Sequence, residues 1–264
     1  MKVVMLGATR GIGRSLARLL AARGESLHLL GRNPDDLAKC AEDLQVRGAA
    51  AVTSSRCDLM APATFGPALE AADAALGGFD TVILSAGLFG TQDELANDRA
   101  RAAAVLTANF GNSVLFCEEA RVRLLARGGG RLVAFSSVAG ERGRKSVVIY
   151  GATKAGLSAY LEGLDHLYRA QGLITTTVKP GFVRTSMTQG LKEPPFAGDP
   201  DDVAKTILSA ILRGAPVVYA PPIWALVMTV IRLLPRAVMR AVTPCAGESL
   251  PSLGLDPRSS EPAS

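Results

Sequence analysis

A tyrosine and a lysine four residues apart, Tyr150 and Lys154, form the pair of side chains best suited to proton transfer. They fall at the start of a segment with helical periodicity, so both project from one face, a turn apart. A tyrosine hydroxyl has a pKa of ~10, and a neighbouring ammonium group stabilises its anion and lowers that pKa. Such a phenol can both donate and accept a proton.

A serine hydroxyl, Ser137, precedes this pair and directly follows a predicted strand at residues 131–135. A hydroxyl there can donate a hydrogen bond to a carbonyl oxygen, which gains charge when a hydride arrives. Singly, each residue has an ordinary structural interpretation: a core tyrosine, a solvated lysine, a turn hydroxyl. Together, at this spacing, they favour acid–base chemistry on a carbonyl or alcohol.

A glycine-rich turn, Gly7-Ala8-Thr9-Arg10-Gly11-Ile12-Gly13, joins the first predicted strand to the first predicted helix. Residues without side chains let the backbone approach a pyrophosphate, which the exposed N–H groups of a helix start stabilise. Glycine triplets also occur in plain turns, so it is the position of this one between a strand and a helix that favours cofactor binding. The turn predicts a dinucleotide site.

The sequence after the second predicted strand, Gly31-Arg32-Asn33, bears on the choice of dinucleotide. An acid at this place would bind a free ribose hydroxyl, whereas Arg32, together with Arg10, suits a 2′-phosphate. NADP(H) is therefore preferred. NAD(H) stays possible because Asp35 and Asp36 are near, and the alternative is that both arginines are solvated surface charges.

Strand and helix patterns alternate along the chain, which predicts an α/β fold with a three-layer, doubly wound parallel sheet. Strands are expected at residues 2–6, 26–31, 51–57, 81–85, 131–135, 174–179 and 217–219. One catalytic domain is expected over residues 1–220, with a substrate loop near 186–200. Apolar and basic helices over 221–242, broken at Pro235, and a flexible tail over 243–264 complete the expected organisation.

The chain has 264 residues, 48% of them apolar, and a formal charge of +5. The excess is carried by five bases between Asp202 and Glu248, which are Lys205, Arg213, Arg232, Arg236 and Arg240. A charge confined to one segment argues against a nucleic-acid-binding protein. The four cysteines show no CxxC, so neither a metal site nor a disulfide framework is indicated, and a reducing cytoplasm fits best.

Taken together, these motifs resemble the short-chain dehydrogenase/reductase family. The matching residues are Gly7, Gly11 and Gly13, Asp58-Leu59, Ser85-Ala86-Gly87, Asn109, Ser137, Tyr150, Lys154 and Pro180-Gly181. The resemblance covers residues 1–215 and implies one Rossmann-type domain that transfers hydride between a nicotinamide and a carbonyl or alcohol. One departure is Ser85, where the family usually has Asn.

The resemblance also implies roles. Tyr150 would be the acid–base group, Ser137 the orienting donor, Lys154 the group that holds the nicotinamide ribose, and Asn109 the anchor of a relay water. The cofactor would be bound by Gly7, Thr9, Arg10, Gly11, Ile12, Gly13, Arg32, Asp58, Leu59, Ala86, Gly87, Tyr150, Lys154, Pro180, Gly181, Val183 and Thr185. A homo-oligomer is expected, with the helices around Asn109 and Tyr150 between subunits.

A narrower similarity, mainly over residues 130–242, is to the decaprenylphosphoryl-2-keto-ribose reductases of cell-envelope biosynthesis. It implies reduction of the 2-keto group of a polyprenyl-phosphate pentose. Arg142, Arg144 and Lys145, between Ser137 and Tyr150, are candidates to receive the substrate phosphate, or else an exposed charged loop.

The segment 223–242 combines apolar residues with a predicted stripe of Arg232, Arg236 and Arg240. That pattern is typical of a helix in a membrane interface, so a location at the inner face of the cytoplasmic membrane is expected. The alternative is packing on the substrate loop or in a dimer interface. For function, the alternatives are a reductase of a soluble carbonyl, such as a 3-oxoacyl thioester or small ketone, and an NADP(H)-binding protein without turnover.

Overall fold

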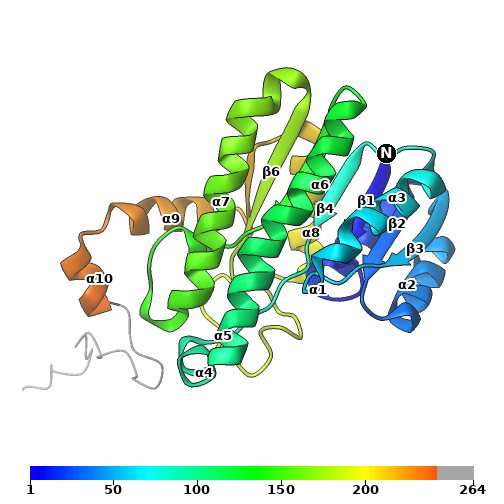
Figure 1. Ribbon diagram of the computed structural model, residues 1–264. Coiled ribbons are helices and arrows are strands. Elements are labelled where there is room, and N and C mark those ends of the chain that lie inside the picture. Colours follow the sequence, from blue (N-terminus) through cyan, green and yellow to red (C-terminus); the bar gives the residue numbers. More distant parts are fainter. Residues whose placement is uncertain (243–264) are drawn as a thin grey trace, which may run out of the picture.

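The protein is built around a single parallel β-sheet, seen in a computed structural model that describes residues 1–242 (Figure 1). Its seven strands lie in the order β3-β2-β1-β4-β5-β6-β7. They are β1 (Lys2–Leu6), β2 (Ser26–Gly31), β3 (Ala51–Arg56), β4 (Thr81–Leu84), β5 (Gly130–Phe135), β6 (Leu173–Pro180) and β7 (Val217–Ala220). Chain order reverses between β1 and β4, which is where such sheets open a ligand crevice at the strands' carboxyl ends.

Helices cover both faces of the sheet. One face carries α1 (Gly11–Ala22), α2 (Pro34–Val46) and α8 (Pro200–Arg213), and the other carries α3 (Phe65–Leu76), α6 (Ser113–Ala126) and α7 (Val148–Tyr168). Alternate residues of β1 serve the two cores: Val3 and Met5 face α1 and α8, while Val4 and Leu6 face α3 and α6. The predicted three-layer, doubly wound α/β fold is confirmed.

The second core is anchored by aromatic packing. Phe65 of α3 and Phe116 of α6 are almost fully buried and meet edge to face, with ring centroids 5.5 Å apart. Figure 1 shows α6 and α7 running side by side in front of the sheet. Helix α7, which bears Tyr150 and Lys154, packs against β6 and against the turn Val138–Gly140 that follows β5.

The helical stretch between β4 and β5 is interrupted. It comprises α5 (Arg99–Leu106), a π-helical turn η2 (Thr107–Asn112) and α6, preceded by the short α4 (Gln92–Asn97). Thr91 and Glu94 cap α4 reciprocally, and Asp98 caps α5. The wider π turn redirects the helix at Asn109, a placement often seen at functional sites.

The chain after β7 forms two helices, α9 (Ile223–Leu233) and α10 (Arg236–Val242), which extend away from the body in Figure 1. They are separated at Pro235, as predicted. No helix among the described residues has the length and apolar content required to cross a bilayer. The tail predicted over residues 243–264 lies outside the described residues.

Candidate active site

The glycine turn between β1 and α1 has a backbone that side chains would obstruct. Gly7 has φ +106°, and a Cβ at Gly13 would overlap the Gly7 carbonyl oxygen. Helix α1 has no side-chain cap and no acid in its first turn, unlike α2 and α8, which Asn33 and Asp199 cap. The first N–H groups of α1 are thus left to an anionic ligand, so the turn fits a pyrophosphate.

Other segments predicted to bind the cofactor converge on this turn. The Ser85 hydroxyl donates to the carbonyl oxygens of Leu6 and Gly7, at 3.2 and 3.0 Å. Ser85 therefore links the ends of β1 and β4 by hydrogen bonds, at the position where the family usually has Asn. Ala86 lies directly against Gly7, and a Cβ on Gly11 would lie 3.3 Å from the Thr185 Cγ2 atom.

The remaining predicted contacts lie along the same edge of the sheet. Thr9 and Ile12 are half-buried within the turn, and the Ile12 side chain packs on the core beneath α1. Asp58 accepts a hydrogen bond from the Met60 N–H at 2.9 Å, which shapes the turn after β3. Leu59 is buried, and its carbonyl accepts from the Asn112 amide at 2.8 Å.

The two arginines thought to select the cofactor are both exposed near the end of β2. Arg32 has no ion pair or side-chain hydrogen bond to any described residue, whereas Arg10 makes an ion pair with Asp36 at 3.4 Å. Because this pair is solvated, Arg10 remains available to a phosphate. Whether Arg10 and Arg32 bind a 2′-phosphate or are solvated surface charges stays a prediction.

Asn109, in the π turn, is fully buried and bonds to a single residue. Its Oδ1 accepts from the Leu88 N–H and its Nδ2 donates to the Leu88 carbonyl, both at 2.7 Å. A Cβ on Gly87 would lie 3.0 Å from Asn109 Oδ1 and 3.6 Å from Lys154 Nζ. Asn109 thus fixes the segment after β4 beside Lys154, and its action on a relay water stays a prediction.

Tyr150, Ser137 and Lys154 come together at the carboxyl end of β5. The Tyr150 side chain is hydrogen-bonded to Ser137, and Lys154 Nζ lies 5.8 Å from the Tyr150 ring centroid. Lys154 Nζ also donates to the Phe135 carbonyl at 2.7 Å. The three side chains predicted to act together therefore lie next to one another in the folded chain.

The electrostatics of this triad differ from the sequence expectation. Burial raises the pKa of Tyr150 to about 12, and the hydrogen bond from Ser137 only partly opposes that rise. Burial likewise lowers the pKa of Lys154 to about 8. Desolvation is the dominant effect on Tyr150, so the lowering of its pKa expected from Lys154 is not seen. The phenol of Tyr150 therefore keeps its proton at neutral pH.

The turn after β6 closes the other side of the crevice. Pro180 accepts a weak hydrogen bond from the Ser137 hydroxyl at 3.5 Å, and Val183 is buried and bridges to Gly198. Gly181 lies so close to the Trp224 indole of α9 that any side chain there would overlap it. The Trp224 Nε1 donates to the Phe196 carbonyl at 3.3 Å, so α9 supports both this turn and the predicted substrate loop.

Arg142, Arg144 and Lys145 are not grouped with the catalytic side chains. They line a separate pocket with Arg236 and Arg240 of α10. The lining of this pocket includes none of Asn109, Ser137, Tyr150 and Lys154. The predicted arginine stripe is also divided. Arg232 makes an ion pair with Glu141 at 3.1 Å, whereas Arg236 and Arg240 line the pocket.

Three residues of the site carried no signal in the sequence. Phe89 packs edge to face on the Tyr150 ring, with centroids 5.0 Å apart. Gln92 Oε1 accepts from the Ile149 N–H at 3.1 Å and so caps the start of α7. The sequence gives no role for Trp224 beyond that of an apolar residue in a helix, and only the fold shows that it touches Gly181.

Comparison with known proteins agrees with this geometry. The model of the short chain dehydrogenase family matches residues 1–195. An uncharacterized oxidoreductase of Mycobacterium tuberculosis is 36% identical over 90% of this chain and 95% of its own length. Carbonyl reductase family member 4 of Danio rerio is 30% identical over 78% of this chain and 88% of its own.

Among solved structures, a short-chain type dehydrogenase/reductase from Mycobacterium ulcerans superposes with a TM-score of 0.76 at 21% identity, covering 91% of this chain and 98% of its own. That likeness bears on the fold alone. The family match spans most of the chain, from the glycine turn to the loop beyond Thr185. The chain belongs to the short-chain dehydrogenase/reductase family of NAD(P)-dependent oxidoreductases.

Proposed function

We propose that this protein is an NADP(H)-dependent carbonyl reductase in which Tyr150 supplies the proton to a ketone oxygen. The observation that carries this proposal is the buried cluster of Tyr150, Ser137 and Lys154 beside the glycine turn. The similarity of the chain to carbonyl reductase family member 4 of Danio rerio also supports reduction of a carbonyl. A protein that only binds NADP(H) has no need of this acid–base pair.

The mechanism follows from the protonation states. The bound dinucleotide supplies a hydride to the carbonyl carbon. Ser137 and Tyr150 share a hydrogen bond, so a carbonyl oxygen near both hydroxyls can accept from each as its negative charge develops. Tyr150 then transfers its proton to that oxygen, and the charge left on the phenolate is stabilised by the Lys154 ammonium.

Phenylalanine at position 150 tests this chemistry. Tyr150→Phe should lower kcat for NADPH-dependent ketone reduction by about 10²- to 10⁴-fold, the usual contribution of a positioned acid. Tyr168→Phe, on the same helix but stacked on Arg121, is the matched control and should retain activity. Unchanged NADPH oxidation in Tyr150→Phe with every responsive carbonyl would show that the assignment is wrong.

The preference for NADP(H) over NAD(H) rests on Arg32. Arg32→Gln should reduce kcat/KM for NADPH by about 10- to 100-fold, the worth of a charge-assisted hydrogen bond, and leave the value for NADH nearly unchanged. Arg99→Gln, which removes an exposed charge from α5, is the control. Equal losses with both cofactors would remove the proposed phosphate contact.

For the substrate, the narrower proposal is the 2-keto group of a polyprenyl-phosphate-linked pentose. The apolar α9 supports a lipid-bearing compound, whereas Arg142, Arg144 and Lys145, the bases expected to receive its phosphate, line a pocket apart from the catalytic side chains. The second candidate is a soluble carbonyl, such as a 3-oxoacyl thioester or small ketone, which the named carbonyl reductase favours. NADPH consumption with each compound decides, and turnover of soluble compounds alone removes the lipid-sugar proposal.

A location at the inner face of the cytoplasmic membrane belongs to the same proposal. Its support is the exposed apolar face of α9 next to the basic residues of α10. Sedimentation of the full-length protein with lipid vesicles tests it directly. Absence of binding to vesicles of any composition would leave a reductase that acts away from membranes.

A further inference from the structure

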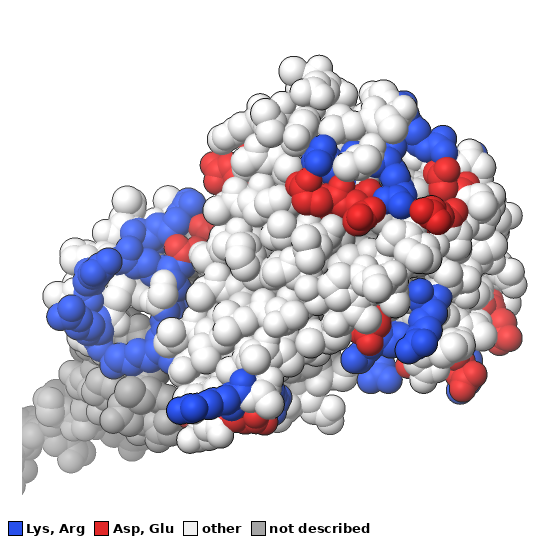
Figure 2. Space-filling model, viewed as in Figure 1, with Lys and Arg blue, Asp and Glu red and all other residues white. Residues whose placement is uncertain are grey.

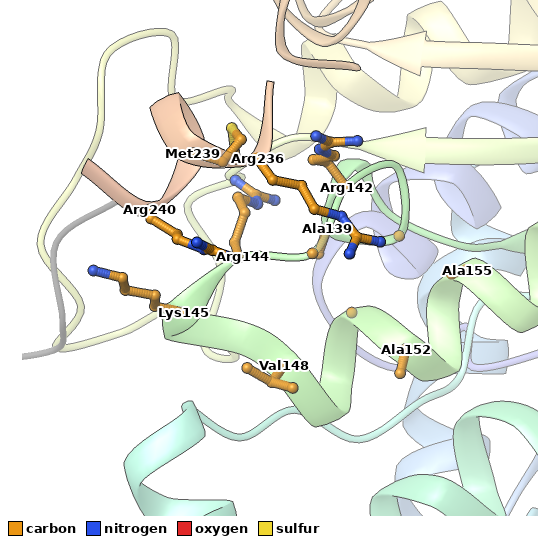
Figure 3. Close-up of a pocket in the computed structure, with 13 residues that line it drawn as sticks. Ala139, Arg142, Arg144, Lys145, Val148, Ala152, Ala155, Arg236, Met239 and Arg240 are labelled. Atoms are coloured by element: carbon orange, nitrogen blue, oxygen red, sulfur yellow. The ribbon is translucent and has the colours of Figure 1, made fainter. Parts of the chain in front are cut away.

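The pocket between α7 and α10 joins two segments that are far apart in the sequence. It has a volume of about 570 Å³ and opens beside the first turns of α7, behind the loop that contains residues 142–145 (Figure 3). Two contacts hold the end of α9 on this loop, from which α10 continues: Arg232 pairs with Glu141, and the Arg142 guanidinium donates to the Leu234 carbonyl at 2.7 Å. The pocket is therefore formed in the folded chain.

The pocket gathers positive charge. Among residues 1–242, its lining contains five bases, Arg142, Arg144, Lys145, Arg236 and Arg240, and no acid. None of the five forms an ion pair with another described residue, and the Nε atom of Arg144 is buried without an acceptor there. Burial lowers the pKa of Arg144, which shows that the surroundings do not compensate its charge.

The acid next to this loop does not provide that compensation. The Glu141 side chain is 5% exposed and is bound to Lys179 and Arg232 on the other side of the loop. A buried or converging set of cations without counter-charges is unfavourable unless an anion joins it. The charge of the pocket, as formed by the described residues, is thus complementary to an anion.

The floor of the pocket consists of small and apolar residues, among them Ala139, Val148, Ala152 and Ala155 (Figure 3). These side chains offer no acceptor that would compete for the five bases. Gly143, on the loop, has nothing within 4 Å of the place of a Cβ. A tetrahedral oxyanion has room there, and several guanidinium groups can donate to it together.

Next to the pocket, α9 has apolar residues on both of its faces. Trp224 and Met228 are buried against the body, whereas Leu226, Val230 and Leu233 are 65%, 54% and 80% exposed. The exposed residues follow helical spacing and form one stripe. Figure 2 shows the Lys and Arg side chains concentrated around this same protruding end of the molecule.

We propose that the pocket binds the phosphate headgroup of an anionic lipid while the exposed stripe of α9 lies in the surface of the bilayer. This inference rests on the proposed membrane location and specifies the contact that produces it. The charge is complementary to a phosphodiester, and the apolar stripe is complementary to the acyl boundary. The site is separate from the catalytic side chains, so it does not depend on which carbonyl is reduced.

The test is flotation of full-length protein with three kinds of vesicle. They contain phosphatidylcholine alone, phosphatidylcholine with phosphatidylglycerol, or phosphatidylcholine with oleate at the same surface charge. The phosphatidylglycerol vesicles should bind the protein most tightly. Their phosphodiester carries an uncompensated negative charge, whereas that of phosphatidylcholine is neutralised by choline and oleate has no phosphate. Arg236→Gln/Arg240→Gln should weaken that binding by about 30-fold, since each base near an anionic surface contributes roughly fivefold.

The matched control is Lys205→Gln/Arg213→Gln, which removes the same charge from α8, away from the pocket. It should retain both the affinity and the preference for phosphatidylglycerol. Leu226→Ser/Val230→Ser should weaken binding to all anionic vesicles without changing their order. Thermal unfolding of each variant establishes that it is folded.

The outcomes separate the inference from the proposed location. Equal binding to oleate and phosphatidylglycerol vesicles overturns the headgroup site but leaves the membrane association. Equal losses of vesicle affinity in the α10 and α8 variants also overturn the headgroup site, because the total charge of the protein would then explain the binding. No binding to any vesicle overturns both this inference and the membrane location, without bearing on the reductase chemistry.

Discussion

Titration of Lys154 should control the pH dependence of this enzyme in the range where Tyr150 does not ionise. Burial lowers the pKa of Lys154 to about 8 and raises that of Tyr150 to about 12. In the proposed mechanism, the ammonium form of Lys154 would bind a ribose hydroxyl and stabilise the phenolate. Above pH 8 that form is lost, whereas Tyr150 keeps its proton.

The size of the effect follows from these values. Nearly all Lys154 is protonated at about pH 7, and about 1% at pH 10, for a pKa of about 8. The value of kcat/KM for NADPH, which reports ionisations of the free enzyme, should fall about 100-fold between those two pH values. It is measured from the initial loss of NADPH absorbance with a saturating ketone.

Lys154→Arg provides the control, because a guanidinium stays charged across this range. Its absolute activity should be lower, since the longer planar group does not reproduce the Phe135 contact. Its profile, however, should be flat between pH 7 and 10. A flat profile in the unsubstituted enzyme, or the same fall in Lys154→Arg, would refute the assignment of this ionisation to Lys154.

Three further substitutions test the glycine turn, the core and the support of α9. Gly13→Ala should abolish NADPH binding in calorimetry, because its Cβ overlaps the Gly7 carbonyl; tight binding would show that the turn does not hold the pyrophosphate. Phe116→Ala should lower the free energy of unfolding by about 3–5 kcal/mol in urea, and a loss below about 1 kcal/mol would contradict its place in the core. Glu141→Gln leaves Lys179 buried without its partner and should cost about 3 kcal/mol, an effect that Glu162→Gln on the surface of α7 should not produce.

The arrangement of the sheet was predictable because it depends on local patterns. Each strand is a short apolar run, and each is followed by an amphipathic helix, so right-handed crossovers leave few topologies. The proximity of Tyr150, Lys154 and Ser137 was predictable for a similar reason: Tyr150 and Lys154 are one helical turn apart, and Ser137 follows a strand directly. These relations survive in the fold because they lie within or directly beside single elements.

Relations between distant elements were not predictable. The apolar pattern runs without a break from residue 98 to 127, so nothing marks the extra residue of the π turn at Asn109. Likewise, Arg144 and Arg240 meet only because α10 folds back over the loop before α7. The pKa of Tyr150 was misjudged because the spacing of Lys154 is visible in the sequence and the degree of burial is not.

The contact between Trp224 and Gly181 determines how far the catalytic unit extends. By secondary structure alone, β7 completes the sheet and the chain after Ala220 resembles an appendage. The indole of Trp224, however, forms the outer wall of the turn that closes the crevice. A shortened enzyme, or a chimera that exchanges C-terminal segments with a relative, must therefore keep helix α9 to keep the turn at Gly181 supported.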